Sequence, residues 1–333
     1  MTNQTAAQTL KPDRRAEWLL ALATSRGTHL YQRGVRRIAN VVRRRWSASR
    51  EPFIRFCFAG RPLILPLSHD LPLIMISHPL YSSNLPRLVS LAARRKPDLV
   101  FIDIGANIGD SVALVAGSVA VPILAIEGDE TFLPLLHYNV AQFEQIEVAE
   151  TYVRFAGAEQ SGLTPVRSGG TAHLSFSHEA PDSSFTMTRL SDVLRDHSRF
   201  AAPGFLKVDT DGFDSRIIAD CLDVLARSHP VLFFEFDPQL MHASGDVESV
   251  AVFNHLDDLG YDHVIAYQNT GELLGARSVS DTEGWRDTAR AFQAGPAGHY
   301  LDLAVYHRDD SDLAIQSLLS ERRFLNEWLA RIK

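Results

Sequence analysis

Polar residues that follow directly on apolar runs are the first candidates for chemistry in this sequence. The run Leu99–Ile102 leads into Asp103 and then into a turn with Gly105 and Gly109, before a helical pattern begins. A second apolar run ends in Glu127, about 20 residues after the turn, where Rossmann-like folds place a ribose-binding acid. Glycines let a ligand approach the backbone, and the free N–H groups of a helix N-terminus face it. The pattern therefore predicts a cofactor site at the carboxyl edge of a parallel sheet.

The spacing of the two glycines narrows the class of cofactor. Gly105 and Gly109 form Gly-x-x-x-Gly, whereas a nicotinamide-dinucleotide site has Gly-x-Gly-x-x-Gly. A phosphate-binding loop would need Gly-x-x-x-x-Gly followed by Lys and by Ser or Thr, and no lysine follows Gly109. NAD and nucleoside triphosphates are both disfavoured.

A further group of carboxylates lies farther along the chain. Asp209 and Asp211 follow the apolar run that begins at Phe205, and Glu235 ends a later apolar run. If these runs are neighbouring strands, Asp209 and Glu235 perturb each other's pKa and one of them can act as a general base. Other interpretations stay open: the pair could hold Mg²⁺ or Ca²⁺ on a sugar diol, or Asp209 could cap the following turn or pair with Lys207. No histidine completes a transition-metal site by its spacing, so no metal site is predicted.

Through these segments the chain resembles the FkbM-type family of S-adenosylmethionine-dependent methyltransferases, which have the class I, Rossmann-like fold. The resemblance spans residues 97–307 and rests on Asp103–Asp110, Ala125–Glu127, Phe205–Asp214 and Leu232–Glu235. It implies that the first loop holds the methionine part of the cofactor, that Glu127 holds the ribose, and that the Lys-x-Asp-x-x-Gly segment lies beside the transferred methyl. Asp211 and Asp214 stand where the family usually has glutamates, so two side chains are shorter here.

The resemblance also implies roles for single residues. The implied cofactor-binding residues are Asp103, Gly105, Ala106, Asn107, Gly109, Asp110, Glu127, Gly128, Ala158 and Asp209. The implied catalytic residues are Asp209, Glu235 and Asp211. The implied reaction is O-methylation, with S-adenosylmethionine as cofactor, of a hydroxyl on a sugar or polysaccharide precursor or on a secondary metabolite. The alternatives are a nucleotide-sugar oxidoreductase or epimerase, which the glycine spacing and the lack of a nearby Tyr-x-x-x-Lys motif disfavour, and a non-catalytic scaffold.

The composition is that of an ordinary globular protein. The chain has 333 residues, of which 45% are hydrophobic and 22% charged, so it can bury a large core. Its two cysteines, Cys57 and Cys221, form no Cys-x-x-Cys motif and indicate neither a zinc site nor a disulfide framework. Neither a run of roughly 18 to 20 apolar residues nor the apolar core of a secretory signal is found, and we expect a cytoplasmic protein.

Positive charge is concentrated in the first 50 residues. This segment holds eleven Lys and Arg residues and two acids, which gives it a net charge of +9. Because the whole chain has a net charge of −7, the remainder carries −16. Tyr31, Val35, Ile38, Val42 and Trp46 recur at helical spacing and indicate a basic amphipathic helix. We expect this helix to pack on the acidic catalytic domain; the alternative is contact with an anionic membrane surface at the inner face of the membrane. Nucleic acid is not expected as a partner, because stacking aromatics are not interleaved with the arginines.

Three parts are predicted along the chain. Residues 1–96 form an accessory region with the basic helix, a β-hairpin from Phe53–Phe58 and Leu63–Leu67, and a linking helix over residues 82–95. Residues 97–308 form the methyltransferase domain, and residues 309–333 a terminal helix. We expect a seven-stranded, mostly parallel sheet with helices on both faces, with strands over residues 99–102, 121–127, 147–156, 204–209, 231–236, 262–268 and 300–307.

Two regions outside the motifs are candidates for acceptor contacts. His69, His78 and Tyr81 lie in the accessory region, and the long connection 269–299 is typical of a substrate-shaping loop. The acceptor is expected to be a small molecule or a glycan. Exposed Leu and Trp side chains on the terminal helices would permit a homodimer.

Overall fold

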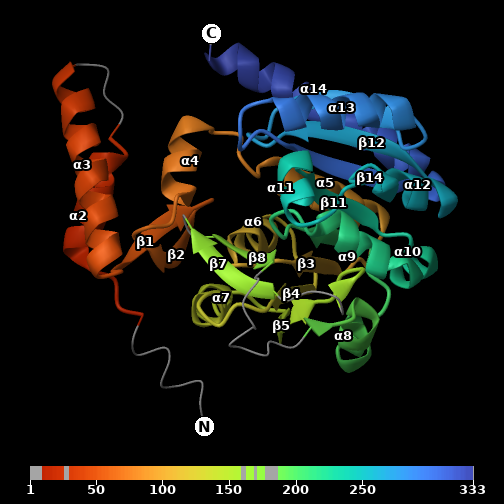
Figure 1. Cartoon of the computed structure of the whole chain (residues 1–333), viewed down its shortest axis with the longest axis horizontal. Helices are drawn as coiled ribbons and strands as arrows, with labels where there is room; N and C mark the ends of the chain where they lie inside the picture. The colour runs from red at the N-terminus through yellow and green to blue at the C-terminus, as the bar shows by residue number, and fades with distance from the viewer. Residues whose placement is uncertain (1–9, 26–29, 159–162, 169–170, 177–186, 333) are drawn as a thin grey trace.

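The computed structural model describes residues 10–25, 30–158, 163–168, 171–176 and 187–332. Its centre is an eight-stranded sheet (Figure 1). In spatial order the strands are β13 (Leu273–Ser278), β12 (Tyr261–Gln268), β14 (Leu301–His307), β11 (Val231–Phe236), β10 (Phe205–Val208), β3 (Phe101–Ile104), β4 (Ile123–Glu127) and β5 (Ile146–Glu150). The five strands from β11 to β5 are parallel, whereas β14 is antiparallel to both of its neighbours. The predicted mostly parallel α/β fold is confirmed, with one strand more than the seven expected.

Helices cover both faces of this sheet, which explains why its central strands lack alternation. Every residue of β3, β4, β10 and β11 is buried. One face packs on α5 (Asn84–Arg95), α6 (Asp110–Ser118), α7 (Leu133–Val140) and α14 (Ser311–Ile332). The other face packs on α8 (Leu190–Asp196), α9 (Asp214–Asp220), α10 (Leu222–Ser228), α12 (Ala251–Asp258) and α13 (Thr282–Ala294). A strand covered on both sides reads as a continuous apolar run.

The accessory region forms a small core beside the sheet together with residues of α6, α7 and their loops, called the accessory core below. Its elements are α2 (Arg14–Ala23), α3 (Leu30–Ser49), β1 (Phe53–Phe58), β2 (Arg61–Pro66) and α4 (Leu71–Ser77). The strands β1 and β2 pair as the predicted hairpin, and α2 and α3 lie side by side at one end of the molecule (Figure 1). The basic helix therefore packs along α2 and not on the acidic catalytic domain as expected, because its buried face is closed by the accessory core.

Several elements were not predicted from the sequence. The connection 269–299 holds β13 and α13 instead of a long loop, and α2, α4 and α11 (Pro238–Ala243) were not expected. The short parallel pair β6 (Tyr152–Val153) and β9 (Met187–Thr188), the antiparallel pair β7 (Leu163–Ser168) and β8 (Thr171–Phe176), and two 3-10 turns (Ser198–Phe200 and Arg308–Asp310) complete the described elements. No described helix combines the length and apolar composition needed to cross a bilayer.

Candidate active site

The turn after β3 is built so closely against the next loop that it needs glycine. Gly105 has a φ of +80°, and a Cβ there would lie 1.9 Å from the backbone oxygen of Asp209. Gly109, with a φ of +84°, precedes α6, and its Cβ would meet Leu136 on α7 at 2.9 Å. The first glycine lets the loops after β3 and β10 meet, whereas the second lets two helices pack.

Glu127, the last residue of β4, organises the neighbouring loops with its carboxylate. Its Oε2 accepts the backbone N–H of Asn107 at 2.8 Å, and its Oε1 accepts those of Gly128 and Asp129 at 2.8 and 2.7 Å. Burial raises the pKa of Glu127, and these three N–H groups oppose that shift. A carboxylate has about four acceptor positions, so one remains for a ligand hydroxyl. Gly128 is required beside it, because a Cβ would lie 2.3 Å from the Tyr152 ring.

Lys207 on β10 connects two of the predicted acids. Its Nζ lies 2.9 Å from Oδ1 of Asp103 and 3.0 Å from Oδ2 of Asp209. Asp103 is fully buried and also accepts the hydroxyl of Ser111, so it faces the core, whereas Asp209 is half-exposed. Burial alone would lower the pKa of Lys207, but the two carboxylates raise it well above its usual value. The interpretation that Asp209 pairs with Lys207 is confirmed.

A second layer of carboxylates lies next to Asp209. Glu235 on β11 is directly opposite Asp302 on β14 in the antiparallel register. Burial, followed by the charge of Asp209, raises the pKa of Glu235 well above its usual value and that of Asp302 to about 7. The same two causes raise the pKa of Asp211 to about 7. At Glu235 both causes favour the neutral, protonated form of the carboxyl, and that form can donate a hydrogen bond.

A cavity of about 210 Å³ joins these loops. Of the predicted site residues it is lined by Gly105, Asn107, Asp110, Glu127, Gly128, Asp209, Asp211 and Glu235. The other four lie outside the described lining of the cavity: Asp103 is bound to Lys207 and Ser111, Ala106 is fully buried in the core, Gly109 packs on α7, and Ala158 packs against the core beyond Phe155. These four residues support the loops whose other residues line the cavity.

Further residues from distant parts of the chain close the cavity. His69 and Tyr81 of the accessory region line it as predicted, whereas His78 is absent from the described lining. Asn84, Tyr152, Tyr300 and Asp302 also line it and were not predicted. A signal for Tyr300 and Asp302 existed: the last strand runs antiparallel, so its first residues lie at the edge where β11 ends.

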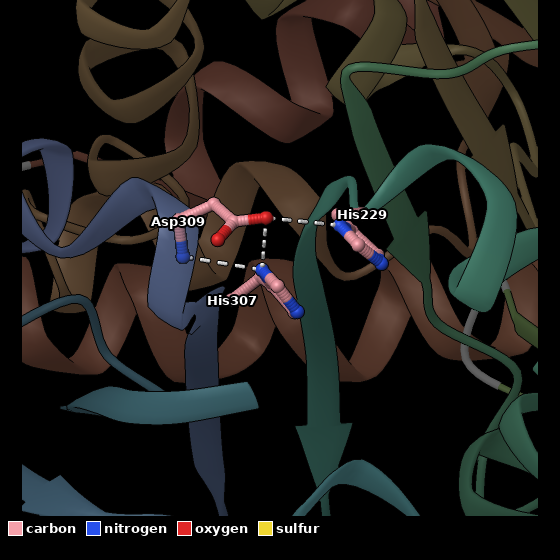
Figure 2. Close-up of side chains that lie close together, drawn as sticks. All are labelled: His229, His307 and Asp309. Atoms are coloured by element: carbon pink, nitrogen blue, oxygen red, sulfur yellow. Dashed lines mark hydrogen bonds and ion pairs between the residues drawn. The ribbon is translucent and has the colours of Figure 1, made fainter. Parts of the chain in front are cut away.

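A separate cluster of His229, His307 and Asp309 lies at the opposite edge of the sheet, where β11 begins and β14 ends (Figure 2). Nδ1 of His307 lies 3.1 Å, and Nδ1 of His229 3.4 Å, from Oδ2 of Asp309. The two rings stack with centroids 3.7 Å apart, and Nδ1 of His307 accepts the backbone N–H of Asp309. These contacts tie the residues just before β11 to the end of β14.

Comparison with known proteins identifies a family model that matches the residues around this cavity. Residues 103–262 match the family model described as the methyltransferase FkbM domain, and no curated protein sequence matches the chain. Solved structures that are similar to this chain include the methyltransferase FkbM from Methylobacillus flagellatus KT, with 18% identity over 50% of this chain and 39% of that chain and a TM-score of 0.35. This chain thus matches about two fifths of the length of that protein.

Two other solved structures have similar scores. The METTL16 methyltransferase domain has 13% identity over 91% of this chain and 88% of its own, with a TM-score of 0.44. TYW2 of M. jannaschii in complex with AdoMet has 10% identity over 78% of this chain and 88% of its own, with a TM-score of 0.39. The loops of residues 103–262 meet at one cavity, and the same residues match the FkbM methyltransferase model, so this part of the chain is an FkbM methyltransferase domain with the class I methyltransferase fold.

Proposed function

We propose that this methyltransferase uses S-adenosylmethionine and transfers its methyl group to a hydroxyl of a small-molecule or glycan acceptor. The observation that carries the proposal is the meeting of the loops after β3, β4 and β10 at one cavity, with Gly105 in contact with the Asp209 backbone. This contact leaves no room for a side chain, so the turn presents bare backbone to a ligand.

The donor set of the cavity fits each part of this cofactor. Glu127 has an acceptor position left for the ribose hydroxyls, and the rings of Phe132, Tyr152 and Phe155 line the cavity beside it, as a purine requires. Asp110, which also lines the cavity, supplies a carboxylate for the ammonium group of the methionine part. When bound, the cofactor supplies an electrophilic methyl group on a positively charged sulfur.

Asp209 and Glu235 have separate roles in the transfer of the methyl group. Asp209 is a half-exposed, ion-paired carboxylate in the cavity wall and takes the proton from the acceptor hydroxyl. Glu235, whose pKa is raised by burial and by the charge of Asp209, lies in the same cavity wall and orients the acceptor through a hydrogen bond. Alignment contributes roughly 7 to 11 kcal/mol in favourable cases, whereas general-base assistance contributes about 10²- to 10⁴-fold in rate, so positioning is the larger effect.

The walls nearest Glu235 indicate an acceptor rich in hydroxyl groups. Tyr81, Tyr300 and Asp302 line this part of the cavity with hydrogen-bonding groups, and Lys207 is already engaged by two carboxylates. Such walls suit neutral hydroxyls and disfavour anionic groups, which would face Asp209 and Asp211. A sugar of a glycan precursor, methylated in the cytoplasm, is the acceptor class that we propose.

The first test is calorimetric titration with S-adenosylhomocysteine, with NAD as the competing ligand. Glu127→Ala should weaken binding by roughly 1.5 to 3 kcal/mol, because it removes charge-assisted bonds to the ribose. Asp209→Asn should keep the affinity within about threefold while strongly reducing turnover with an accepted hydroxyl substrate. Asp258→Asn, an exposed acid at the end of α12, serves as the control and should change neither.

Equal loss of affinity in the Glu127 and Asp209 variants would contradict the division of roles. Binding of NAD in place of S-adenosylhomocysteine would overturn the choice of cofactor.

A further inference from the structure

One side of the basic helix α3 exposes a line of apolar side chains. Tyr31, Ile38 and Val42 are 81, 67 and 43% exposed, and their spacing of seven and four residues places them on one side of the helix. An adjacent side of the helix is closed, because Ala39 and Arg43 are buried against the accessory core. Large apolar side chains aligned on a surface helix mark an interaction face.

Arginines cover much of the remaining exposed surface of α3, and their charge is not balanced locally. Arg33, Arg36, Arg37, Arg44 and Arg45 are all exposed. Among the described residues, Arg43 is the one arginine of α3 that forms an ion pair, and its partner is Asp70. An exposed apolar line beside unbalanced arginines is the arrangement of helices that lie in a membrane interface.

A groove between α3 and α4 is lined by both arginine and apolar side chains. It is about 630 Å³ in volume and is lined by Arg36, Arg37 and Arg44 together with the apolar Val41, Leu73 and Ile76. No carboxylate of a described residue lines it. Three guanidinium groups beside an apolar floor match a phosphate group that carries acyl chains.

We propose that α3 docks on a bilayer that contains anionic lipids, with the groove arginines on lipid phosphates and Tyr31, Ile38 and Val42 in the headgroup region. Charge complementarity selects this occupant, since the first 50 residues carry +9 and the remainder −16, which orients the molecule with α3 toward an anionic surface. A nucleic-acid backbone would satisfy the arginines but leave the apolar line in water.

This docking would place the membrane one helix away from the candidate active site. Arg43 fixes α3 to the start of α4, donating to the carbonyl oxygens of Leu67 at 2.9 Å and Ser68 at 3.1 Å and to Oδ1 of Asp70 at 2.8 Å. In α4, Leu71 and Ile74 line the active-site cavity, and Leu73, Ile76 and Ser77 line the groove. The docking stands whether or not methyl transfer from S-adenosylmethionine is the reaction.

The test is co-sedimentation of the full chain with vesicles. Phosphatidylcholine vesicles should bind little, and vesicles containing phosphatidylglycerol should bind strongly and release the protein as salt is raised. Arg36→Gln/Arg37→Gln/Arg44→Gln should lower the affinity about 100-fold, at about fivefold for each arginine near the surface. Ile38→Asp should weaken binding even at low salt, because the apolar contact is lost.

The matched control is Arg322→Gln/Arg323→Gln/Arg331→Gln, which removes the same charge from exposed arginines of α14. It should retain the binding, and all variants should keep the circular dichroism spectrum and the binding of S-adenosylhomocysteine, if the chain binds it. Equal binding to neutral vesicles, equal loss in the control, or displacement from the vesicles by a DNA duplex at equal phosphate concentration would overturn the proposal.

Discussion

Lys207 is the side chain on which the charge balance of the site depends. It is buried between Asp103, which has no exposed surface, and Asp209, which opens to the cavity. A buried carboxylate that loses its cationic partner keeps its desolvation cost without compensation. Lys207 is thus required for stability before it has any role in the reaction.

Lys207→Met should destabilise the protein by about 3 to 5 kcal/mol, because it leaves Asp103 buried with only the Ser111 hydroxyl as partner. Lys96→Met is the matched control: it breaks the more exposed pair with Asp310 and should cost no more than about 1 kcal/mol. Urea unfolding at neutral pH measures both. Equal costs for the two variants would show that burial of the Lys207 pair is not decisive.

Asp302 gives the site a pH-dependent stability. Burial and the charge of Asp209 raise its pKa from 3.8 to about 7. Between these values the folded protein holds a proton that the unfolded chain has released, so this carboxyl lowers stability as pH rises through that window. In Asp302→Asn this contribution is absent, and the variant should become more stable relative to the parent as pH rises from about 4 to about 7.

The measurement is the free energy of unfolding of both proteins at several pH values in that window. Asp258→Asn, an exposed acid, should follow the parent profile at every pH. A constant difference between Asp302→Asn and the parent would mean that Asp302 does not titrate in this range.

The residues of the site differ in how far the sequence reveals them. Glu127 and Asp209 end apolar strands beside a glycine turn, so their place in the cavity could be predicted locally. Tyr300 and Asp302 gain their place from the antiparallel direction of β14, which depends on pairing across the sheet. Local patterns show which residues end a strand, and only the topology shows which ends meet.

At the scale of elements, the connection 269–299 shows the same limit. Gly271 and Gly275 suggest a loop, yet β13 forms there with Gly275 paired to Ala266 at an irregularity in the register. The following helix had a recognisable start, since Asp281 accepts the N–H of Gly284 as an N-cap. Trp285 then stacks on Phe253 at 4.2 Å between centroids, a contact that no local pattern reveals.

The junction of β3 with α6 offers a sharper prediction at this scale. Gly105→Ala would force a side chain into the left-handed region and toward the Asp209 oxygen, and should cost at least about 3 kcal/mol. Gly117→Ala, within α6, is the control. Its Cβ would meet nothing closer than 3.9 Å, and alanine is favoured over glycine in a helix. Thermal unfolding should show a large drop for the first variant and no loss for the second; a tolerated Gly105→Ala would refute the close contact of the two loops.

At the scale of the whole molecule, the accessory region and the catalytic sheet share side chains. The accessory core joins Leu63 and Leu65 of the hairpin with Ile108, Leu114 and Leu135 of the helices and loops that belong to the sheet. Asn139 on α7 adds polar bonds across the same boundary. Its Oδ1 accepts the N–H of Ile64 at 2.7 Å, and its Nδ2 donates to the carbonyl oxygens of Ile64 and Ile108 at 2.9 and 2.8 Å.

This shared core predicts that residues 10–96 and the sheet unfold together. Two variants with a single tryptophan each test this prediction. One retains Trp46, which packs against the accessory core, and the other retains Trp285, which lies in the core on the far face of the sheet. Their fluorescence transitions in urea should have the same midpoint relative to the circular dichroism of each variant, because neither part can expose its share of the core alone. An earlier transition of Trp46 would instead support the sequence-based boundary at residues 96 and 97 as the limit of a separately folding part, and α3 could then leave the molecule to meet a membrane without unfolding the active site.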